Sequence, residues 1–410
     1  MKDVSRQKIA WFLPDFNEGS GGIRTVLQNA CYLVKSGYIC DLYIVDSKKT
    51  EEQYKRLITD CYGLNFNHNI YCGDSLNGKY DAAIATFFKT AGVVAALDVP
   101  HKLYFVQDYE PFFFPTSENS IEAERSYCLG LSPITIGKWL SNKVRNEEDS
   151  VPFFSFCADL NTYKKLEDTT KEDAICFVCQ PDKPRRCTEL GLKALQIIKK
   201  KRPDIKVYLF GSPKTNVINL KAKHLGLLPV EECNSLYNKC KVGICLSATN
   251  PSRIPFEMMA AGLPVVDLYL ENNLYDEVDE GCLLAMPDAN SIAEAALKII
   301  EDKTLYNTLS SDGYNYMKNY PLERGYKEFK EALDMIILGG KTHLDSAVRK
   351  KQYNKKPYSA EKKSIISEPS VRLLSNIEKK NNKRIERDQQ RKNTFWGKVV
   401  LKIRYLIRGY

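Results

Sequence analysis

The sequence predicts an α/β protein with two Rossmann-like domains, each built on a parallel sheet, followed by a basic C-terminal tail. Short apolar runs alternate with helical patterns through both halves of the chain, which is typical of parallel strands with helices on both faces. The chain has 410 residues, of which 43% are hydrophobic, enough for two domains of about 150 residues and an additional segment. Residues 341–410 carry a net charge of +14, whereas residues 1–340 carry −5.

The strands are expected where the apolar runs are short and rich in β-branched or aromatic residues. In the first half these runs cover residues 9–14, 40–45, 81–88, 102–107 and 132–137. In the second half they cover residues 173–179, 206–211, 242–247, 264–269 and 281–286. Helices are expected between the strands, and the pattern of residues 306–338 is also helical.

The loop-like stretch from Val151 to Asp173 indicates a boundary between the two domains. We divide the chain into residues 1–160, residues 161–340 and a tail of residues 341–410. The N-terminus lacks a signal-peptide pattern, and no run of about 18 apolar residues is present. We therefore expect a cytoplasmic protein that is neither secreted nor membrane-spanning.

The cysteines and histidines argue against several classes of site. The thirteen cysteines are odd in number and scattered through apolar segments, a pattern that favours free thiols in a reducing compartment. The four histidines are dispersed along the chain. This distribution argues against a histidine-based metal site and against a Ser/His/Asp triad. We expect neither a metal nor a cofactor.

The loop and helix within residues 246–267, LSATNPSRIPFEMMAAGLPVVD, form the main candidate site. A helix that begins near Arg253 leaves its first N–H groups without intrahelical partners, and its dipole favours an anion there. Backbone amides from Asn250 through Ser252 and Ile254 could hold a diphosphate, and Glu257 could accept hydrogen bonds from a ribose. The alternative is an ordinary buried helix capped by polar residues.

Two further loops follow predicted strands of the first half, where ligands of parallel sheets bind. Gly21 and Gly22 follow the first strand and let the backbone approach a ligand at a helix N-terminus, although an ordinary tight loop has the same pattern. Asp108 and Glu110 lie in QDYEPFFFP. Aromatic rings stack on sugars, and a carboxylate can accept a hydroxyl proton or stabilise positive charge. The alternative is a hydrophobic wall with two solvated acids.

A basic turn follows the first predicted strand of the second half. Lys183, Arg185 and Arg186 precede a helix in QPDKPRRCTELGLKAL. Such cations can neutralise a leaving nucleoside diphosphate without a metal. A solvated basic turn is the alternative.

The run that ends in GLPVVD resembles the nucleotide-sugar loop of the retaining GT-B glycosyltransferases of family 4. The matching residues are Glu257, Met259, Ala260, Gly262, Pro264, Val265 and Val266. The chain departs from that pattern at Thr249, where the family has a glutamate that meets the donor sugar. A narrower resemblance covers NPSRIPFEMMAAGLPVVD, QDYEPFFFP and QPDKPRRCTELGLKAL, which are similar to the WsaF-type rhamnosyltransferases of bacterial polysaccharide assembly.

The resemblance implies a GT-B fold, in which the terminal helices cross back onto the first domain, and several roles for single residues. Gly21 and Gly22, with Arg24 nearby, would face the donor phosphates across the cleft between the domains. Leu225 falls in the segment whose backbone reads the nucleobase, and Arg253 falls in the donor loop.

The implied reaction moves a sugar, expected to be L-rhamnose from dTDP-L-rhamnose, onto a cell-surface or lipid-linked polysaccharide with retention at the anomeric carbon. A nucleotide-sugar 2-epimerase and a non-catalytic GT-B subunit of a polysaccharide complex are the alternatives. The departure at Thr249 favours the second of them.

The end of the tail has a different composition from the rest. Apolar side chains in FWGKVVLKIRYLIRGY recur at helical spacing, with Lys398, Lys402 and Arg408 outside the stripe. This pattern is typical of an interfacial helix on anionic lipid, and we expect residues 393–410 to hold the protein on the inner face of the cell membrane. Docking on a protein surface is the alternative, and nucleic acid is not expected. Up to about Lys392 the tail is polar and indicates a solvated linker or a charged helix.

Overall fold

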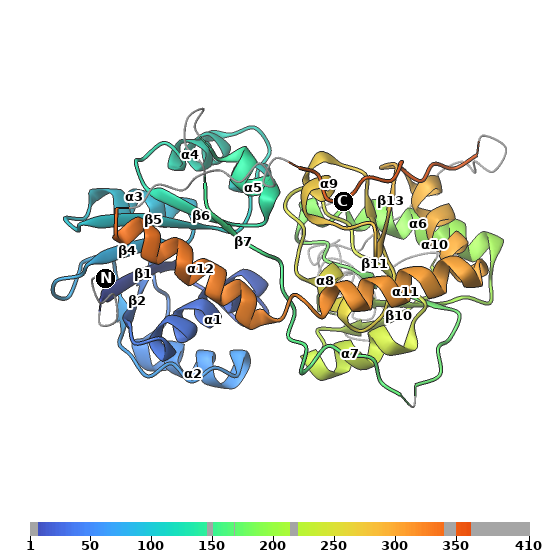
Figure 1. Ribbon diagram of the computed structural model, residues 1–410, viewed down its shortest axis with the longest axis horizontal. Coiled ribbons are helices and arrows are strands. Elements are labelled where there is room, and N and C mark those ends of the chain that lie inside the picture. The colour runs from blue at the N-terminus through green and yellow to red at the C-terminus, as the bar shows by residue number, and fades with distance from the viewer. Residues whose placement is uncertain (1–6, 146–150, 168, 214–219, 340–349, 362–410) are drawn as a thin grey trace, which may run out of the picture.

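The computed structural model describes residues 7–145, 151–167, 169–213, 220–339 and 350–361, which form two α/β domains side by side (Figure 1). The first domain has a seven-stranded sheet in the order β3-β2-β1-β4-β5-β6-β7, and all of its strand pairs are parallel. Its strands are β1 (Lys8–Pro14), β2 (Ile39–Val45), β3 (Ile70–Cys72), β4 (Ala82–Ala85), β5 (His101–Val106), β6 (Ser132–Ile136) and β7 (Phe153–Phe154).

Two helices of the first domain begin at residues whose side chains cap them. Ser20 accepts a hydrogen bond from the N–H of Ile23 at the start of α1, and Thr50 forms a capping box with Gln53 at the start of α2. Gly63 ends α2 in the left-handed conformation, which glycine adopts without strain. The helices are α1 (Gly21–Lys35), α2 (Glu51–Tyr62), α3 (Phe88–Ala96), α4 (Glu118–Ser126), α5 (Lys138–Lys143) and the 3₁₀ turn η1 (Glu110–Phe113).

The second domain has a six-stranded, wholly parallel sheet in the order β10-β9-β8-β11-β12-β13. Its strands are β8 (Ala174–Val178), β9 (Lys206–Phe210), β10 (Lys223–Gly226), β11 (Val242–Ile244), β12 (Val265–Leu268) and β13 (Cys282–Ala285). Its helical elements are η2 (Pro184–Arg186), α6 (Thr188–Lys201), α7 (Val230–Lys239), α8 (Ile254–Ala260), α9 (Glu271–Asp276), α10 (Ala289–Glu301) and α11 (Lys303–Met317).

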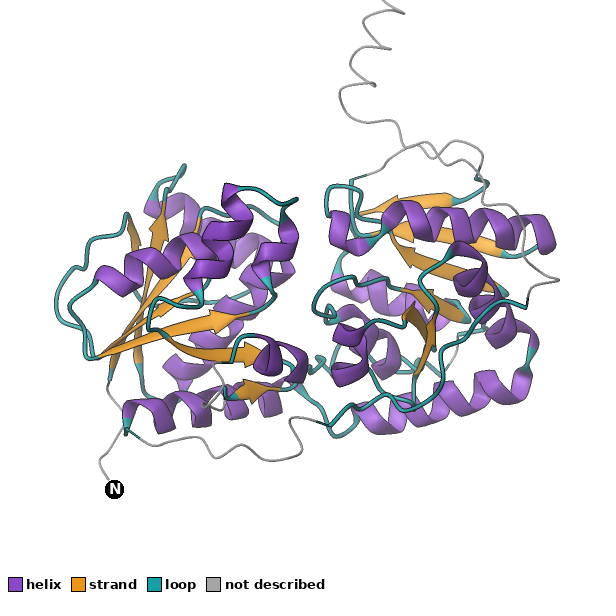
Figure 2. Cartoon of the chain, turned by 90° about the horizontal axis from the view of Figure 1, so that it is seen from above, coloured by secondary structure: helices purple, strands orange, loops and turns teal. Residues whose placement is uncertain are grey.

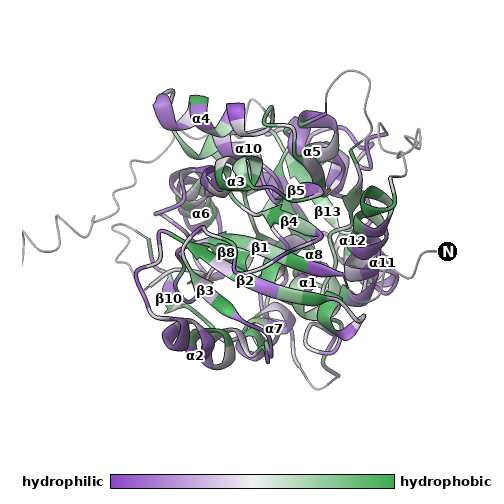
Figure 3. Cartoon of the chain, turned by 90° about the vertical axis from the view of Figure 1, so that its left-hand side faces the viewer, coloured by the Kyte–Doolittle hydropathy of each residue, from purple (hydrophilic) through white to green (hydrophobic). Residues whose placement is uncertain are grey.

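The central strands are buried on both faces, because helices cover each side of a parallel sheet. Residues Ile9–Leu13 of β1 and Ile175–Phe177 of β8 have no exposed surface. In the hydropathy view, the hydrophobic colour follows the strands and the hydrophilic colour follows the outer helices (Figure 3). These continuous apolar strands explain why the sequence predicts parallel sheets, and the predicted two-domain fold class is confirmed.

The last helix crosses from the second domain to the first. After α11 the chain turns at Pro321, and α12 (Leu322–Ile337) packs on α1, β6 and β7 (Figures 1 and 2). Phe329 of α12 packs against both Trp11 and Phe105, at ring centroid distances of 5.8 and 5.1 Å. Such buried aromatic contacts attach α12 firmly to the first domain.

Residues 350–361 return to the second domain. Tyr358 pairs with Ala285 in a parallel bridge, and Tyr353 is buried with 2% exposure. The expectation of a solvated linker or a charged helix is therefore wrong for this part of the tail, because two tyrosines supply apolar surface in an otherwise polar stretch. The predicted membrane helix of residues 393–410 lies outside the described residues. No helix among the described residues is long and apolar enough to cross a membrane.

Candidate functional site

Asp108, directly after β5, is held by the second domain. Its carboxylate accepts hydrogen bonds from the hydroxyl of Thr249 and from the backbone N–H of Asn250, both at 3.0 Å. The guanidinium of Arg185 lies 3.5 Å from the same carboxylate. Burial raises the pKa of Asp108, and the charges of Arg186 and Arg185 oppose that rise. Asp108 thus joins the two domains, and both of its carboxylate oxygens accept hydrogen bonds from the second domain.

Asn250 makes the reciprocal contact. Its side-chain amide donates to the carbonyl oxygens of Gln107 at 3.0 Å and of Ile136 at 3.1 Å. Both carbonyls lie near the carboxyl ends of strands of the first sheet. The loop after β11 therefore joins the loops after β5 and β6, and this brings predicted site residues of both domains together.

The basic turn η2 lies against this junction. The guanidinium carbon of Arg185 lies 4.0 Å from the centroid of the Phe113 ring, a cation–π contact between the domains. Arg186 is buried and donates to the hydroxyl of Ser247 at 2.6 Å and to the carbonyl of Asn250 at 3.5 Å. Burial lowers the pKa of the half-buried Lys183 to about 8. The turn is therefore not solvated: the Arg186 guanidinium binds the loop after β11, and the Arg185 guanidinium contacts Asp108 and Phe113 of the first domain.

Helix α8 begins at Ile254, close to the predicted start, and it carries Glu257 in its first turn. Burial raises the pKa of the half-buried Glu257, while the charge of Arg253 opposes the rise. Ser252 accepts a hydrogen bond from the N–H of Ile254 at 3.3 Å, so part of the capping alternative is realised. Asn250 takes no part in the cap, because it is bound to the first domain.

Arg253 reaches the first domain from the start of α8. It donates to the carbonyl of Cys157 at 3.2 Å and to the side-chain oxygen of Gln28 in α1 at 2.9 Å. Helix α1 also carries the predicted phosphate-facing residues Gly21, Gly22 and Arg24. The start of α8 is therefore linked to the middle of α1 across the domain boundary.

The first two residues of α1, Gly21 and Gly22, leave the backbone accessible to a ligand. Gly21 and Gly22 are exposed, and a Cβ atom at Gly22 would come within 3.4 Å of the Gln107 side chain. Arg24 is directed instead toward the end of α2, where it donates to the carbonyl of Tyr62 at 3.2 Å. The two glycines thus lie beside the junction, and Arg24 already has a partner within its own domain.

Leu225 lies in β10 and is half-buried. The neighbouring Leu227 is exposed, and its side chain lies 4.0 Å from the position of a Cβ atom at Gly19. The end of β10 therefore faces the loop before α1 of the first domain.

Glu110 lies deeper in the first domain than Asp108. It accepts hydrogen bonds from the N–H of Phe88 at 2.7 Å and from the hydroxyl of Tyr104 at 3.2 Å. Burial raises the pKa of Glu110 to about 8. It is therefore buried at the start of α3 and is not a solvated acid, and both of these hydrogen-bond donors belong to the first domain.

Sequence reasoning missed Asp276 at the end of α9. Its carboxylate accepts the N–H groups of Lys138 at 2.7 Å and Trp139 at 3.1 Å, and so it caps helix α5 of the other domain. Nothing in the sequence around Asp276 indicates this partner. The one signal is Gly137, whose positive φ of 83° leaves room for the carboxylate.

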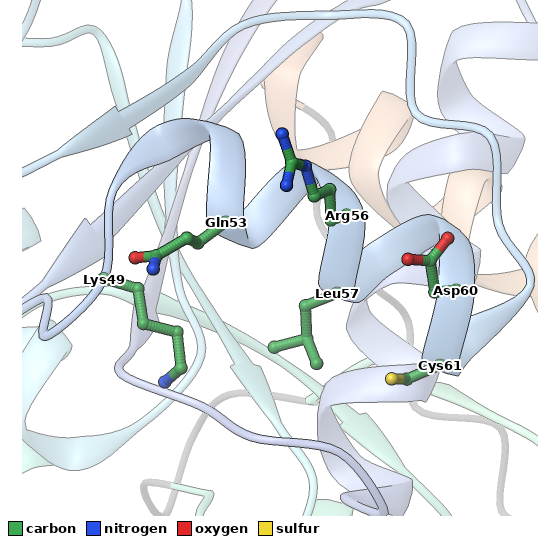
Figure 4. A pocket seen from close by; sticks show the side chains of 6 residues that line it. All are labelled: Lys49, Gln53, Arg56, Leu57, Asp60 and Cys61. Carbon is green, nitrogen blue, oxygen red and sulfur yellow. The ribbon is translucent and has the colours of Figure 1, made fainter.

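A separate surface pocket of about 350 Å³ lies along α2 (Figure 4). Its walls are formed by Lys49, Gln53, Arg56, Leu57, Asp60 and Cys61. None of these residues is among the predicted site residues. Within the described ranges, no group of three or more histidine, cysteine or acidic side chains could hold a metal ion.

Residues 173–297 match the family model of the WsaF C-terminal domain. The O-antigen biosynthesis protein RfbC of Myxococcus xanthus is 29% identical over 303 residues, which cover 69% of this chain and 23% of that protein. The chain therefore spans about a quarter of the length of this relative.

Two solved structures have the same architecture. Sucrose-phosphate synthase from Thermosynechococcus elongatus superposes with a TM-score of 0.62 at 14% identity, over 82% of this chain and 100% of that chain. Anabaena Alr3699/HepE, solved with UDP and glucose, superposes with a TM-score of 0.61 at 14% identity, over 80% of this chain and 100% of that chain. The chain has a GT-B fold whose second domain is similar to the WsaF C-terminal domain.

Proposed function

We propose that this chain is a glycosyltransferase that binds a nucleotide sugar between its two domains. The observation that carries the proposal is the meeting of Asp108 with Thr249, Asn250 and Arg185. It joins the carboxyl ends of strands from both sheets, where ligands of such folds bind. Two arginines and a carboxylate at this place suit a reaction that releases a nucleoside diphosphate.

The second domain would hold the nucleotide. Arg185 and Arg186, with Lys183 beside them, supply the positive charge for the diphosphate, and charge-assisted hydrogen bonds from arginine are among the strongest in proteins. Glu257 would accept the ribose hydroxyls, and the segment around Leu225 would contact the nucleobase. Backbone and side-chain groups of the donor loop complete this half of the site, namely those of Asn250, Ser252, Arg253 and Ile254.

The first domain would close over the donor. Gly21 and Gly22 would approach the phosphates, and Arg24 would add charge if it leaves its contact with Tyr62. Asp108 would act at the sugar from the opposite wall, and Glu110 would support that wall. Fixed cations would stabilise the departing diphosphate without a metal, because they are already oriented when charge develops.

We propose L-rhamnose from dTDP-L-rhamnose as the donor sugar, transferred with retention in the manner of family 4. The match of residues 173–297 to the WsaF C-terminal domain supports this choice. The name of the RfbC relative, an O-antigen biosynthesis protein, supports a role in polysaccharide biosynthesis. We propose an oligosaccharide or lipid-linked acceptor for such a role. Residues 393–410 would hold the enzyme at the anionic inner face of the cell membrane, where such an acceptor lies.

The test is a turnover assay with dTDP-rhamnose, followed by NMR of the sugar. We expect dTDP to be released only when an acceptor is present, and we expect the product to retain the anomeric configuration of the donor. Conversion of the donor without acceptor would identify an epimerase instead. Nucleotide binding without turnover, under every acceptor condition, would favour a non-catalytic subunit, for which the departure at Thr249 is the supporting observation.

A further inference from the structure

Residues 350–355 of the described tail are hydrogen-bonded along helix α9 and the turn that follows it. The backbone N–H groups of Gln352 and Tyr353 both donate to the carbonyl of Leu274, at 2.9 and 3.1 Å. The N–H groups of Asn354 and Lys355 donate to a carboxylate oxygen of Asp279, at 3.0 and 3.1 Å. Such backbone contacts fix the path of the segment independently of its side chains.

Tyr358 makes a single parallel bridge with Ala285 at the edge of the second sheet. Tyr358 donates its N–H to Leu284 at 2.8 Å and accepts from Met286 at 2.9 Å. The hydroxyl of the buried Tyr353 accepts from the N–H of Leu284 at 3.1 Å. The strap, residues 350–361, therefore joins α9 to the edge strand β13.

The last residue of α9, Asp276, contacts the first domain, where its carboxylate caps α5. The contact is close, because a Cβ atom at Gly137 would lie 2.8 Å from the Asp276 oxygens and 2.6 Å from Phe156. The side-chain amide of Gln352 in the strap donates to the backbone carbonyl of Asp276 at 3.4 Å. The C-terminal end of α9 thus binds the strap through its backbone carbonyls and caps α5 of the first domain through the Asp276 side chain.

We propose that the strap fixes α9 so that Asp276 stays on the N-terminus of α5, and that it thereby holds the two domains in the closed arrangement that binds the donor. Asp276 is a positioning residue in this account and does not touch the substrate. This inference rests on the proposed function only where it predicts weaker dTDP binding. The separation of the domains can be measured without any ligand.

The test uses the full chain with Tyr353→Ala, which removes the buried ring of the strap, and Asp276→Asn, which replaces one acceptor oxygen by an NH₂ group. Both variants are expected to increase the radius of gyration in X-ray scattering and to weaken dTDP binding by about 5- to 150-fold, the usual range of coupling between sites. Lys356→Ala in the strap and Glu271→Gln in α9, both at exposed positions, are the matched controls.

The double variant decides whether the strap acts through Asp276. If it does, Tyr353→Ala combined with Asp276→Asn is no weaker in dTDP binding than the stronger single variant, because both changes remove one shared contact. Effects that add in the logarithm of the dissociation constant would overturn the proposal, as would an unchanged radius of gyration in Tyr353→Ala.

Two truncations cover the case in which Tyr353→Ala fails to fold. A chain ending at Glu361 keeps the strap and is expected to match the full chain, whereas a chain ending at Gly340 lacks it and is expected to be more open. A synthetic peptide of residues 350–361 should then reverse the opening. Equal dimensions of the two truncated chains would contradict the proposal. If the full chain binds no nucleotide, the proposed function fails, but the scattering comparison still decides the role of the strap.

Discussion

Asp108 and Asn250 bind each other's loops across the domain boundary. The carboxylate of Asp108 accepts the backbone N–H of Asn250 at 3.0 Å, and the side chain of Asn250 donates to the carbonyl of Gln107, the residue before Asp108, at 3.0 Å. Because both groups are buried, breaking one contact leaves several polar atoms without partners. This pair therefore helps to hold the two domains together.

We expect Asp108→Ala to lower the free energy of unfolding by about 1–3 kcal/mol, since Thr249 and Asn250 lose a buried acceptor. Asp108→Asn should cost less, because the Thr249 hydroxyl can rotate and accept a hydrogen bond from the new amide. Urea denaturation measures both values. Asp98→Ala, at an exposed acid of the same domain, is the control, and a loss in Asp108→Ala no larger than in this control would contradict the account.

Glu110 should make stability depend on pH. Its pKa is raised to about 8 in the folded protein, above the unfolded value of about 4.3. The folded state therefore binds an extra proton between these pH values, and stability falls as pH rises from about 4.3 to 8. Glu110→Gln stays neutral and should lack this slope. Urea midpoints at pH 5.5, 7 and 8.5 test the difference, and parallel profiles of the two proteins would refute the buried, protonated state.

Arg185 and Arg186 should control nucleotide affinity. We expect Arg185→Ala to weaken dTDP binding by about 1.5–3 kcal/mol, the usual contribution of a hydrogen bond to a charged group. Arg186→Ala should have a larger effect, because Arg186 also orients Ser247 and Asn250. Calorimetric titration measures these affinities. The exposed Lys221 of the same domain, replaced by alanine, supplies the control, and equal affinities in all three variants would exclude the arginines from the site.

Gly137 and Gly130 provide a matched pair of backbone tests. Both have positive φ, 83° and 77°, but a Cβ atom at Gly137 would clash with Asp276 and Phe156, whereas one at Gly130 has no neighbour within 4 Å. Each alanine variant should lose about 1–3 kcal/mol of stability through backbone strain, and Gly137→Ala should lose more. Thermal unfolding compares them, and equal losses would mean that the interdomain cap at Gly137 is absent in solution.

Membrane binding by residues 393–410 is best tested with a truncated chain that keeps the strap. A chain ending at Gly340 would remove the buried Tyr353 as well as the predicted membrane helix, so the informative chain ends at Glu361. We expect that chain to keep activity on a soluble acceptor and to lose binding to liposomes that contain anionic lipid. Replacing Trp396 and Ile403 by serine in the full chain, which retains every charge, should have the same effect. Unchanged liposome binding would rule out the membrane helix.

The sequence predicted each strand that is buried on both faces, because such strands read as continuous apolar runs. It missed β3, β7 and β10, which are short edge strands with only partly buried side chains. The predicted run 81–88 was too long, since Phe87 and Phe88 already begin α3. The local hydrophobic pattern of the sequence is therefore sufficient to predict the fold class, but it does not predict the short strands at the edges of the sheets.

The candidate site was only partly accessible from sequence. The topology of parallel sheets places the loops after the strands at one edge, and this is why the sequence directed attention to the polar groups of those loops. The pairing of Asp108 with Thr249, 141 residues apart, and the cap made by Asp276 depend on how the two domains meet. No periodicity or motif in the chain encodes that geometry. The sequence shows that Thr249 departs from the family pattern, but it does not show that Thr249 binds Asp108.

The most direct test of the proposed nucleotide site is thermal unfolding of the full chain with dTDP, UDP and GDP and with their sugars, because a ligand that binds the native state raises the melting temperature. The account predicts a shift with dTDP and dTDP-rhamnose that is lost in Glu257→Ala and Arg185→Ala and kept in Lys221→Ala. A shift selective for UDP or GDP would change the donor. No shift with any nucleotide would contradict the account.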